Sequence, residues 1–394
     1  MERVAVTGLG VVSSIGVGID QYWSALLSAN SNPTNVSDPY ANMANRLLYG
    51  IDDRSVNGAG PGRATGAGHP GRASAFAVTA TAAALRDAGL DRDAPAGTGV
   101  VIGTGVGDVS LFEDVPAGAT PPDGPDRFPF KVSSVLAAHF GLDGPVTSVS
   151  TACSASAYAV SLAADLIRDG AADVVVTGGT DSYTRVGVAC FNRMGALDPV
   201  ACRPFDAGRL GTVFGEGAAI MVLESESHAL ARGHDRPYAL IEGAGWSCDG
   251  HHPTAPEAGA AQIVRAMHAA MDEAGVGPGD IGCVVPHGTG TPLNDVIESR
   301  GLAAVFGEAT ATLPLYSLKA MLGHTGGAAG GFALLTAALI VDRGVVPPNV
   351  TLAEPDPLCP VRLDRDGLTG PVDHALVNAY AFGGNNISVV IGRG

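Results

Sequence analysis

A cysteine at the start of a predicted helix has the position expected of a nucleophile. Cys153 follows the strand-like run 146–149 and precedes the alanine-rich segment 157–167, which we expect to be helical. The positive end of a helix dipole stabilises a thiolate and lowers the pKa of a cysteine placed there. Position alone leaves two interpretations open: a nucleophile for covalent chemistry, or one more small buried side chain.

Two histidines lie among small residues rather than on an apolar helical face. His287 stands in the segment 286–292 (PHGTGTP), and His324 stands in the segment 322–330 (LGHTGGAAG), just before an apolar stretch. A backbone without bulky side chains lets a substrate approach an imidazole closely. Both rings are therefore candidates for proton transfer or hydrogen bonding in catalysis, although a purely structural histidine is the more common case.

Other patterns associated with cofactors or metals are missing from the sequence. The adjacent histidines at 251–252 have no carboxylate or further histidine at metal-ligand spacing, so we predict no metal site. The glycines at 8–10 lack the third glycine of a dinucleotide fingerprint, and no phosphate-binding loop or GxSxG elbow occurs, so we expect no cofactor. Five further cysteines, which we expect to be reduced and packed in the core, are Cys190, Cys202, Cys248, Cys283 and Cys359.

Strand-like and helix-like segments alternate along the chain, which predicts an α/β protein. The expected strands are 3–12, 99–103, 146–149, 174–177, 218–223, 238–244, 281–285 and 374–379, and the expected helices are 20–28, 73–88, 153–168 and 260–273. The apolar stretch 328–341 is shorter than the ~20 residues that a membrane-spanning helix needs, so we predict a buried helix. Two glycine- and proline-rich tracts, 30–71 and 116–129, are predicted to be loops.

A faint internal repeat indicates that these elements are duplicated. The segment 85–105 resembles 271–290, and the helix end 166–170 resembles 339–344. Two matches in the same order predict two related halves, which we place at 1–235 and 236–394. Cys153 and His324 would then stand at the starts of equivalent helices, and pseudo-symmetry would bring those helix ends together.

The composition of the 394 residues restricts the classes of partner. The chain carries 39 acidic against 23 basic side chains, for a formal charge of −16, which disfavours nucleic acid and anionic membranes. Hydrophobic residues make up 46%, enough for a large core. The N-terminus shows no basic segment followed by a signal-type apolar run, so we expect a cytoplasmic protein.

The segments around these residues resemble the β-ketoacyl-[acyl-carrier-protein] synthases. In order, they are TACSAS (151–156), RPFDAGR (203–209), GEGA (215–218), HGTGTPLND (287–295), 319–324 and FGGNN (382–386). The resemblance extends from residue 4 to the C-terminus. It implies the thiolase fold, in which two fused βαβαβ-type halves make a five-layered α-β-α-β-α core, and normally a dimer.

The resemblance also implies a catalytic assignment. Cys153 would hold the growing acyl chain as a thioester, while His287 and His324 would stabilise the enolate formed when a malonyl-carrier thioester loses CO2. The backbone N–H groups of Cys153 and Phe382 would then bind the oxyanion formed by attack on the acyl group. Lys319 resembles the lysine that orients this network, and it is one of only two lysines in the chain.

Two phenylalanines and two carboxylates complete the implied site. Phe382 resembles the gating phenylalanine of the family, and Phe191 resembles one that lines the acyl pocket. Glu216 and Asp295 match loop-holding residues and are left out of the catalytic set.

The combination of one cysteine with two histidines resembles elongating synthases rather than other branches. Degradative thiolases carry a second catalytic cysteine, and Cys359 lies outside the place that such a residue would occupy. Chain-length factors replace the nucleophile, whereas Cys153 is present. The sequence departs from the family at Ala333, where a glutamate is usual, and at 380–381 and 286. These departures favour a type II polyketide or polyene system over primary fatty-acid elongation.

The implied partners are an acyl carrier protein with phosphopantetheine-bound groups and a second ketosynthase-like chain. Short loops around the acyl pocket predict a heterodimer with a chain-length-factor-like homologue, with a homodimer as the alternative. A catalytically weakened pairing subunit, favoured by Ala333 and the short loops, is the alternative function. Because carrier proteins are usually acidic, docking on this acidic chain requires a local arginine patch.

Overall fold

Two copies of one α/β unit follow each other along the chain in the computed structural model, which describes residues 2–36, 38, 40–52, 71–91, 94–119, 128–350 and 352–394. The first unit contains β1 (Val4–Ser13), α2 (Arg72–Asp87), β5 (Gly99–Gly103), α3 (Val132–Phe140), β6 (Val146–Val149), α4 (Ala155–Arg168), β7 (Val174–Asp181) and β9 (Gly217–Ser225). The second contains β10 (Ala239–Cys248), α7 (Ala261–Ala274), β11 (Ile281–Val285), α8 (Pro292–Phe306), α10 (Ala329–Arg343), β14 (His374–Tyr380) and β15 (Asn385–Gly392).

Shorter elements connect and extend these units. The helices are α1 (Ile19–Ser28), α5 (Arg185–Arg193), α6 (Glu226–Ala231) and α9 (Lys319–Leu322). The short strands are β2 (Gly16–Val17), β3 (Thr34–Asn35), β4 (Leu47–Tyr49), β8 (Phe214–Gly215), β12 (Val345–Val346) and β13 (Leu368–Thr369). The 3₁₀ turns that matter for the site are η5 (Ala152–Ser154) and η8 (Gly326–Ala328).

The strand order is the same in both units. The main sheet runs β11-β14-β15-β10-β1-β9-β7-β5-β6, with β1 and β10 paired antiparallel where the units meet. In the first unit β6, β5 and β7 are parallel to one another, and β9 is antiparallel to β7 and to β1. In the second unit Leu315 bridges β11 in parallel, β14 is parallel to β11, and β15 is antiparallel to β14 and β10. The duplication predicted from the two sequence echoes is therefore present, while the boundary at 235/236 stays a prediction.

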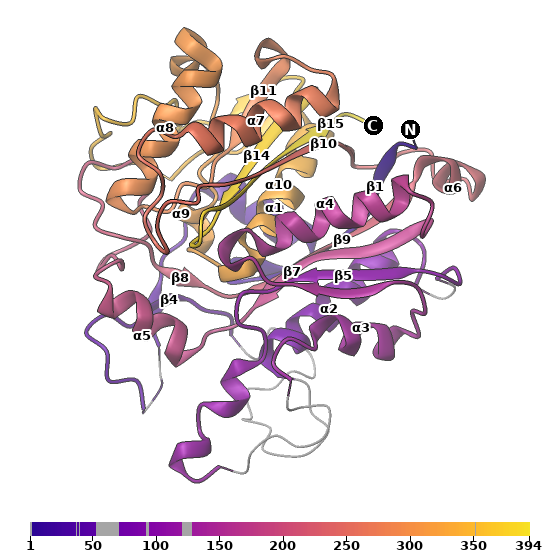
Figure 1. The fold of residues 1–394 in the computed structure, drawn as a ribbon, viewed down its shortest axis with the longest axis horizontal. Helices are drawn as coiled ribbons and strands as arrows, with labels where there is room; N and C mark the ends of the chain where they lie inside the picture. The colour runs from indigo at the N-terminus through magenta and orange to yellow at the C-terminus, as the bar shows by residue number, and fades with distance from the viewer. Residues whose placement is uncertain are drawn as a thin grey trace.

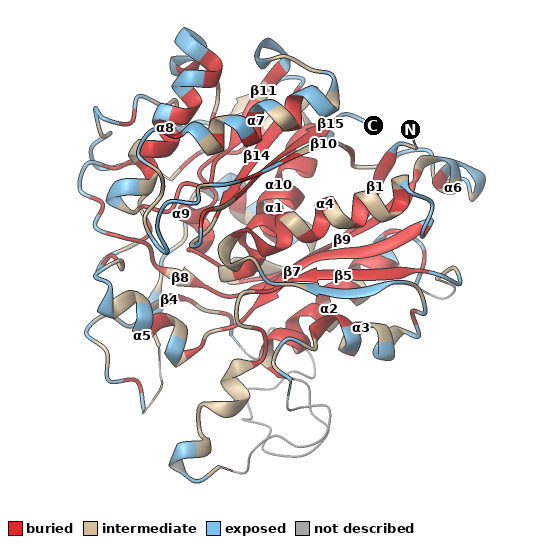
Figure 2. Ribbon diagram, in the orientation of Figure 1, coloured by how far each residue is buried: buried red, intermediate tan, exposed pale blue. Residues whose placement is uncertain are grey.

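The elements form five layers (Figure 1), as the thiolase-type expectation required. Helices α2 and α3 cover the outer face of the first sheet half, α7 covers the outer face of the second with α8 packed against it, and α4 and α10 lie between the halves. Buried residues concentrate in the strands and in the two central helices (Figure 2), whereas the outer helices expose one face. The fold class is confirmed.

The central helices approach each other closely because small residues face one another. A Cβ atom on Gly330 of α10 would lie 2.8 Å from the Cβ of Ala157 in α4. The backbone N–H of Gly331 donates a 2.7 Å hydrogen bond to the Ser156 hydroxyl. This contact sets the distance between the N-termini of α4 and α10.

The structure corrects several boundaries. Helix α4 begins at Ala155 rather than at residue 153, because the turn η5 precedes it. The predicted buried helix at 328–341 is α10, and the helical stretch 326–343, the one among the described residues that is long and apolar enough to span a membrane, has 83% of its residues buried in the protein, as a core helix does. The prediction of loops at 30–71 and 116–129 missed β3 and β4, and residues 53–70 and 120–127 lie outside the described residues.

The close contact of the central helices predicts an unusual response to a helical Gly→Ala change. An alanine is normally favoured over glycine inside a helix by about 1 kcal/mol. At Gly330, however, the added methyl group meets Ala157, and we expect Gly330→Ala to lower the free energy of unfolding by about 1–3 kcal/mol. Urea denaturation measures this. Gly279→Ala, where no atom lies within 4 Å of the added carbon, is the control, and an equal response of both variants would contradict the packing argument.

Candidate active site

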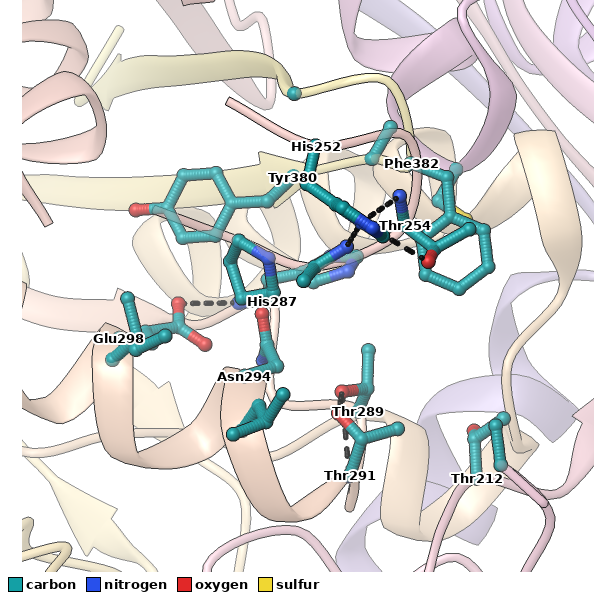
Figure 3. A pocket seen from close by; sticks show the side chains of 18 of the residues that line it. Thr212, His252, Thr254, His287, Thr289, Thr291, Asn294, Glu298, Tyr380 and Phe382 are labelled. Carbon is teal, nitrogen blue, oxygen red and sulfur yellow. Dashed lines mark hydrogen bonds between the residues drawn. The ribbon is translucent and has the colours of Figure 1, made fainter. Parts of the chain in front are cut away.

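One cavity of about 370 Å³ gathers residues from both units. Its wall contains Cys153, His287, His324, Phe382 and Phe191, which the sequence assigned to one site. Figure 3 shows several of the lining side chains, with His287 and Phe382 among those labelled. Lys319 is buried next to His287, outside the cavity wall.

Cys153 lies in the turn that leads into α4. The preceding residue, Ala152, has φ of 50°, a left-handed conformation that is uncommon for alanine and marks a sharp, constrained turn. Burial raises the pKa of the Cys153 thiol to about 11, while the charge of Lys319 and a backbone hydrogen bond from Phe382 act in the opposite direction. The expectation of a lowered pKa is therefore wrong, because loss of hydration outweighs the favourable charges at the start of the helix.

His287 is held in one tautomer by Lys319. The Lys319 ammonium nitrogen lies 3.4 Å from His287 Nδ1 and also donates to the His287 carbonyl oxygen. An ammonium group only donates, so Nδ1 must accept and the ring proton lies on Nε2. Burial and, second, the charge of Lys319 lower the pKa of His287 well below its usual range, so the ring is neutral at pH 7.

His324 reaches the same state through the backbone. Its Nδ1 accepts a 3.1 Å hydrogen bond from the Gly326 N–H, which leaves the proton on Nε2. Burial lowers the pKa of His324 to about 3, and Lys319 adds to the effect. The rings of His287 and His324 lie 5.8 Å apart, nearly perpendicular to each other. Two neutral N–H donors thus flank one cavity, an arrangement suited to an anionic oxygen.

A buried carboxylate accompanies Lys319. Glu298 of α8 accepts 2.7 Å hydrogen bonds from the backbone N–H groups of His287 and Gly288, and Figure 3 shows the bond to His287. Burial raises the pKa of Glu298 to about 7. Burial lowers the pKa of Lys319, and Glu298 is the group that most strongly opposes this. Ala333, where the resemblance expects a glutamate, is a buried residue of α10. Glu298 is therefore the carboxyl group that most strongly favours the charged form of Lys319.

The two phenylalanines form a stack across the cavity wall. The rings of Phe191 and Phe382 lie 5.2 Å apart and within 14° of parallel, and Phe214 meets Phe191 edge-on at 4.7 Å. The turn after Phe382 needs glycine, because Gly384 has φ of 77° and a Cβ there would lie 2.7 Å from Asp249. A stacked ring on a constrained turn fits the predicted gating position.

Sequence patterns missed one residue beside the site, Glu298, and were wrong about two cysteines outside the cavity wall. Glu298 was not singled out, although its spacing three residues after Asp295 on a helix could have indicated it. Glu216 and Asp295 hold loops, as predicted, through hydrogen bonds to backbone N–H groups. Cys190 and Cys248 are exposed, so the prediction of core packing is wrong for them; α5 buries only Val188, and Cys248 ends β10. Cys202, Cys283 and Cys359 are buried.

The cavity wall also contains His252, which the sequence analysis had considered only as a metal ligand. Its Nδ1 accepts the backbone N–H groups of Thr254 and Ala255. In the part of the chain that the structure describes, no group of three or more histidine, cysteine or acidic side chains has metal-binding geometry.

A duplicated thiolase-type fold with a cysteine and two histidines in one cavity defines the class of acyl-transferring condensing enzymes. Residues 1–229 match the family model of the beta-ketoacyl synthase N-terminal domain, and residues 238–353 match that of the C-terminal domain. The chain therefore belongs to the β-ketoacyl synthase family, as the sequence motifs predicted. Enzymes of this family are acyltransferases.

Known relatives agree with this assignment along the whole chain. The 3-oxoacyl-[acyl-carrier-protein] synthase 2 of Staphylococcus aureus (strain COL) is 32% identical over 412 residues, covering 99% of this chain and 98% of the relative. Among solved structures, the ishigamide ketosynthase/chain length factor superimposes with a TM-score of 0.89 at 35% identity, covering 100% of this chain and 99% of that one. A type II polyketide ketosynthase, described as bound to the hexaketide and in complex with its acyl-carrier protein, has a TM-score of 0.88 at 25% identity, with both chains fully covered.

The protonated state of Cys153 predicts a steep pH dependence of its reactivity. Thiolate is the reactive form, so alkylation of Cys153 by iodoacetamide should accelerate about tenfold per unit between about pH 7 and pH 10. The rate is measured by mass spectrometry of the Cys153 peptide. A cysteine in a short peptide, which levels off above about pH 8.5, is the reference. A plateau of Cys153 at that lower pH would contradict a pKa of about 11.

Proposed function

We propose that this chain catalyses the decarboxylative condensation of a Cys153-bound acyl group with a malonyl-[acyl-carrier protein], extending a polyketide or fatty acyl chain by two carbons. The observation that carries the proposal is the pair of neutral Nε2–H donors on His287 and His324, which share one cavity with Cys153. Membership of the β-ketoacyl synthase family supports the same chemistry.

The first step loads the acyl chain. Cys153 Sγ attacks the carbonyl carbon of the acyl-carrier thioester, and the bond to the phosphopantetheine sulfur breaks. The proton of the Cys153 thiol leaves with the carrier sulfur, so the exchange is balanced without a general base. Lys319 and the Phe382 N–H favour the thiolate during the attack.

The second step forms the carbon nucleophile. The bond between the malonyl carboxylate and its methylene carbon breaks, CO2 departs, and the electron pair passes to the thioester as an enolate. The negative oxygen accepts hydrogen bonds from Nε2–H of His287 and His324, whose neutral rings donate without losing a proton. Lys319 keeps the His287 proton on Nε2.

The third step joins the chains. The enolate carbon attacks the Cys153 acyl carbonyl, and the resulting oxyanion accepts hydrogen bonds from the backbone N–H groups of Cys153 and Phe382. Collapse of this intermediate expels the Cys153 thiolate, which takes up a proton from solvent to restore the thiol, and the β-ketoacyl product remains on the carrier protein. Phe191, stacked on Phe382, bounds the space for the acyl chain at this point.

The histidine assignment predicts a selective loss of activity. Because both rings act after Cys153 is acylated, His287→Ala and His324→Ala should each lower malonyl-carrier decarboxylation by about 10²–10³-fold while Cys153 still accepts an acyl group. Decarboxylation is followed by release of labelled CO2 and acylation by mass spectrometry. His268→Ala, at an exposed position on α7, is the control. An acyl group absent from Cys153 of the unmodified chain would overturn the proposed function in favour of a non-catalytic pairing subunit.

We also propose that a chain-length-factor-like homologue completes the working enzyme as a heterodimer. Strand β6 lies at the edge of the main sheet and exposes Val146, Thr147 and Ser148, an edge that a second chain of the same fold can cover. The ishigamide neighbour is described as a ketosynthase/chain length factor. The chain purified alone should elongate little, and co-expression with such a homologue should restore elongation. Full activity of a homodimer would contradict this.

A further inference from the structure

A second buried carboxylate ties the two units together beside the active site. Asp181, the last residue of β7, is 3% exposed. It accepts five hydrogen bonds, from the Thr104 hydroxyl (2.7 Å), Val106 N–H (3.0 Å), Gly107 N–H (3.1 Å), Gly105 N–H (2.8 Å) and Gly327 N–H (2.5 Å). Four of the five donors are in the loop after β5, and the fifth is in η8 of the other unit.

The surrounding backbone leaves room for this carboxylate and little else. A Cβ atom on Gly326 would lie 2.6 Å from Asp181 Oδ2, and a Cβ on Gly105 would lie 2.9 Å from the same oxygen. Gly326 is the residue whose N–H donates to His324 Nδ1. Asp181 thus holds the peptide next to the one that fixes the His324 tautomer.

Asp181 in the first unit corresponds to the region of Phe382 in the second, because β7 and β14 are equivalent strands of the two units. In the second unit, Phe382 follows β14 and hydrogen-bonds through its backbone to Cys153 at the start of α4. In the first unit, Asp181 ends β7 and hydrogen-bonds to Gly327 at the start of α10. The equivalent strand of each unit therefore holds the start of the other unit's central helix.

We propose that Asp181 is a positioning residue for the condensation: it holds η8 so that His324 keeps its proton on Nε2 and points that donor at the enolate. The proposal rests on the proposed function and extends it to a residue outside the cavity wall. Asp181 acts through Gly327 and Gly326 and is not among the residues that line the cavity.

Asp181 also contributes to the electrostatics of Cys153. The titratable groups around the Cys153 thiol are Lys319, Asp181 and the two neutral histidines; Lys319 lowers the pKa of Cys153 and Asp181 raises it. Burial raises the pKa of Asp181 itself, and its hydrogen-bond donors oppose this. Removing the Asp181 charge should therefore make Cys153 easier to ionise while His324 loses its alignment.

The variant Asp181→Asn tests both effects at once. An amide presents one oxygen and one NH2 group, so its donors must face backbone N–H groups that now donate to a carboxylate. We expect the side-chain ¹⁵N spectrum to show His324 losing its single Nε2–H state while His287 keeps it, and condensation to fall by about tenfold or more. The pKa of Cys153 should fall in this variant. At a fixed pH below that pKa, a fall of half a unit makes alkylation of Cys153 about threefold faster.

Asp108→Asn is the matched control. Asp108 is another buried carboxylate of the same loop region, but it accepts from Ser74 at the start of α2 rather than from η8. It should leave the His324 spectrum and the Cys153 profile unchanged. Cys283, which is fully buried, reports unfolding, since it reacts with iodoacetamide only if the core opens.

The outcomes separate the two proposals. If the wild-type chain with its partner makes no product, the proposed function fails, and the His324 spectrum and Cys153 profile still decide the role of Asp181. An Asp181→Asn protein with unlabelled Cys283, an unchanged His324 spectrum and an unchanged Cys153 profile overturns the inference. If Cys283 of the Asp181→Asn protein reacts with iodoacetamide, the core has opened and a second variant, Thr104→Val, decides instead. This variant removes one hydrogen-bond donor to Asp181, and we expect a smaller shift of the His324 signal in the same direction. No shift of that signal overturns the inference.

Discussion

The contact between α4 and α10 is the constraint on which the site depends. Each helix is the central helix of its unit, and each follows a turn that carries a residue of the site, Cys153 before α4 and His324 before α10. Because glycine and alanine face each other at 330 and 157, the helices pack closely and their N-termini open into one cavity. Neither unit contains the site alone. The duplicated fold therefore explains why residues 171 positions apart in the sequence act together.

Burial then determines the protonation states within that cavity. Desolvation keeps the Cys153 thiol protonated and both imidazoles neutral, and it lowers the pKa of the Lys319 ammonium. Neighbouring donors, Lys319 for His287 and the Gly326 N–H for His324, place both ring protons on Nε2. A site built this way stabilises a negative oxygen by hydrogen bonding and leaves the thiol proton to depart with the leaving sulfur. Its chemistry follows from neutral donors rather than from a charged base.

Sequence patterns predicted correctly those features that a short segment, or a repeat of one, reveals by itself. The glycine-rich segments around His287, His324 and Phe382, and the two echoes 173–186 residues apart, correctly indicated the family, the fold class and the duplication. Patterns failed where the answer depends on neighbours from distant segments. The pKa of Cys153 was predicted in the wrong direction because burial at a junction of two units has no local signature. Asp181 and Glu298 went unnoticed because most of their partners are backbone N–H groups, which every sequence contains.

The central claim is that two neutral histidines, each with its proton on Nε2, form the site for the enolate oxygen. Neutron diffraction from a deuterium-exchanged crystal near neutral pH observes those protons directly. The account predicts deuterium on Nε2 of both His287 and His324, none on Nδ1 of either ring, and three deuterons on Lys319 Nζ. Deuterium on Nδ1 of either histidine, with or without a second one on Nε2, would contradict it.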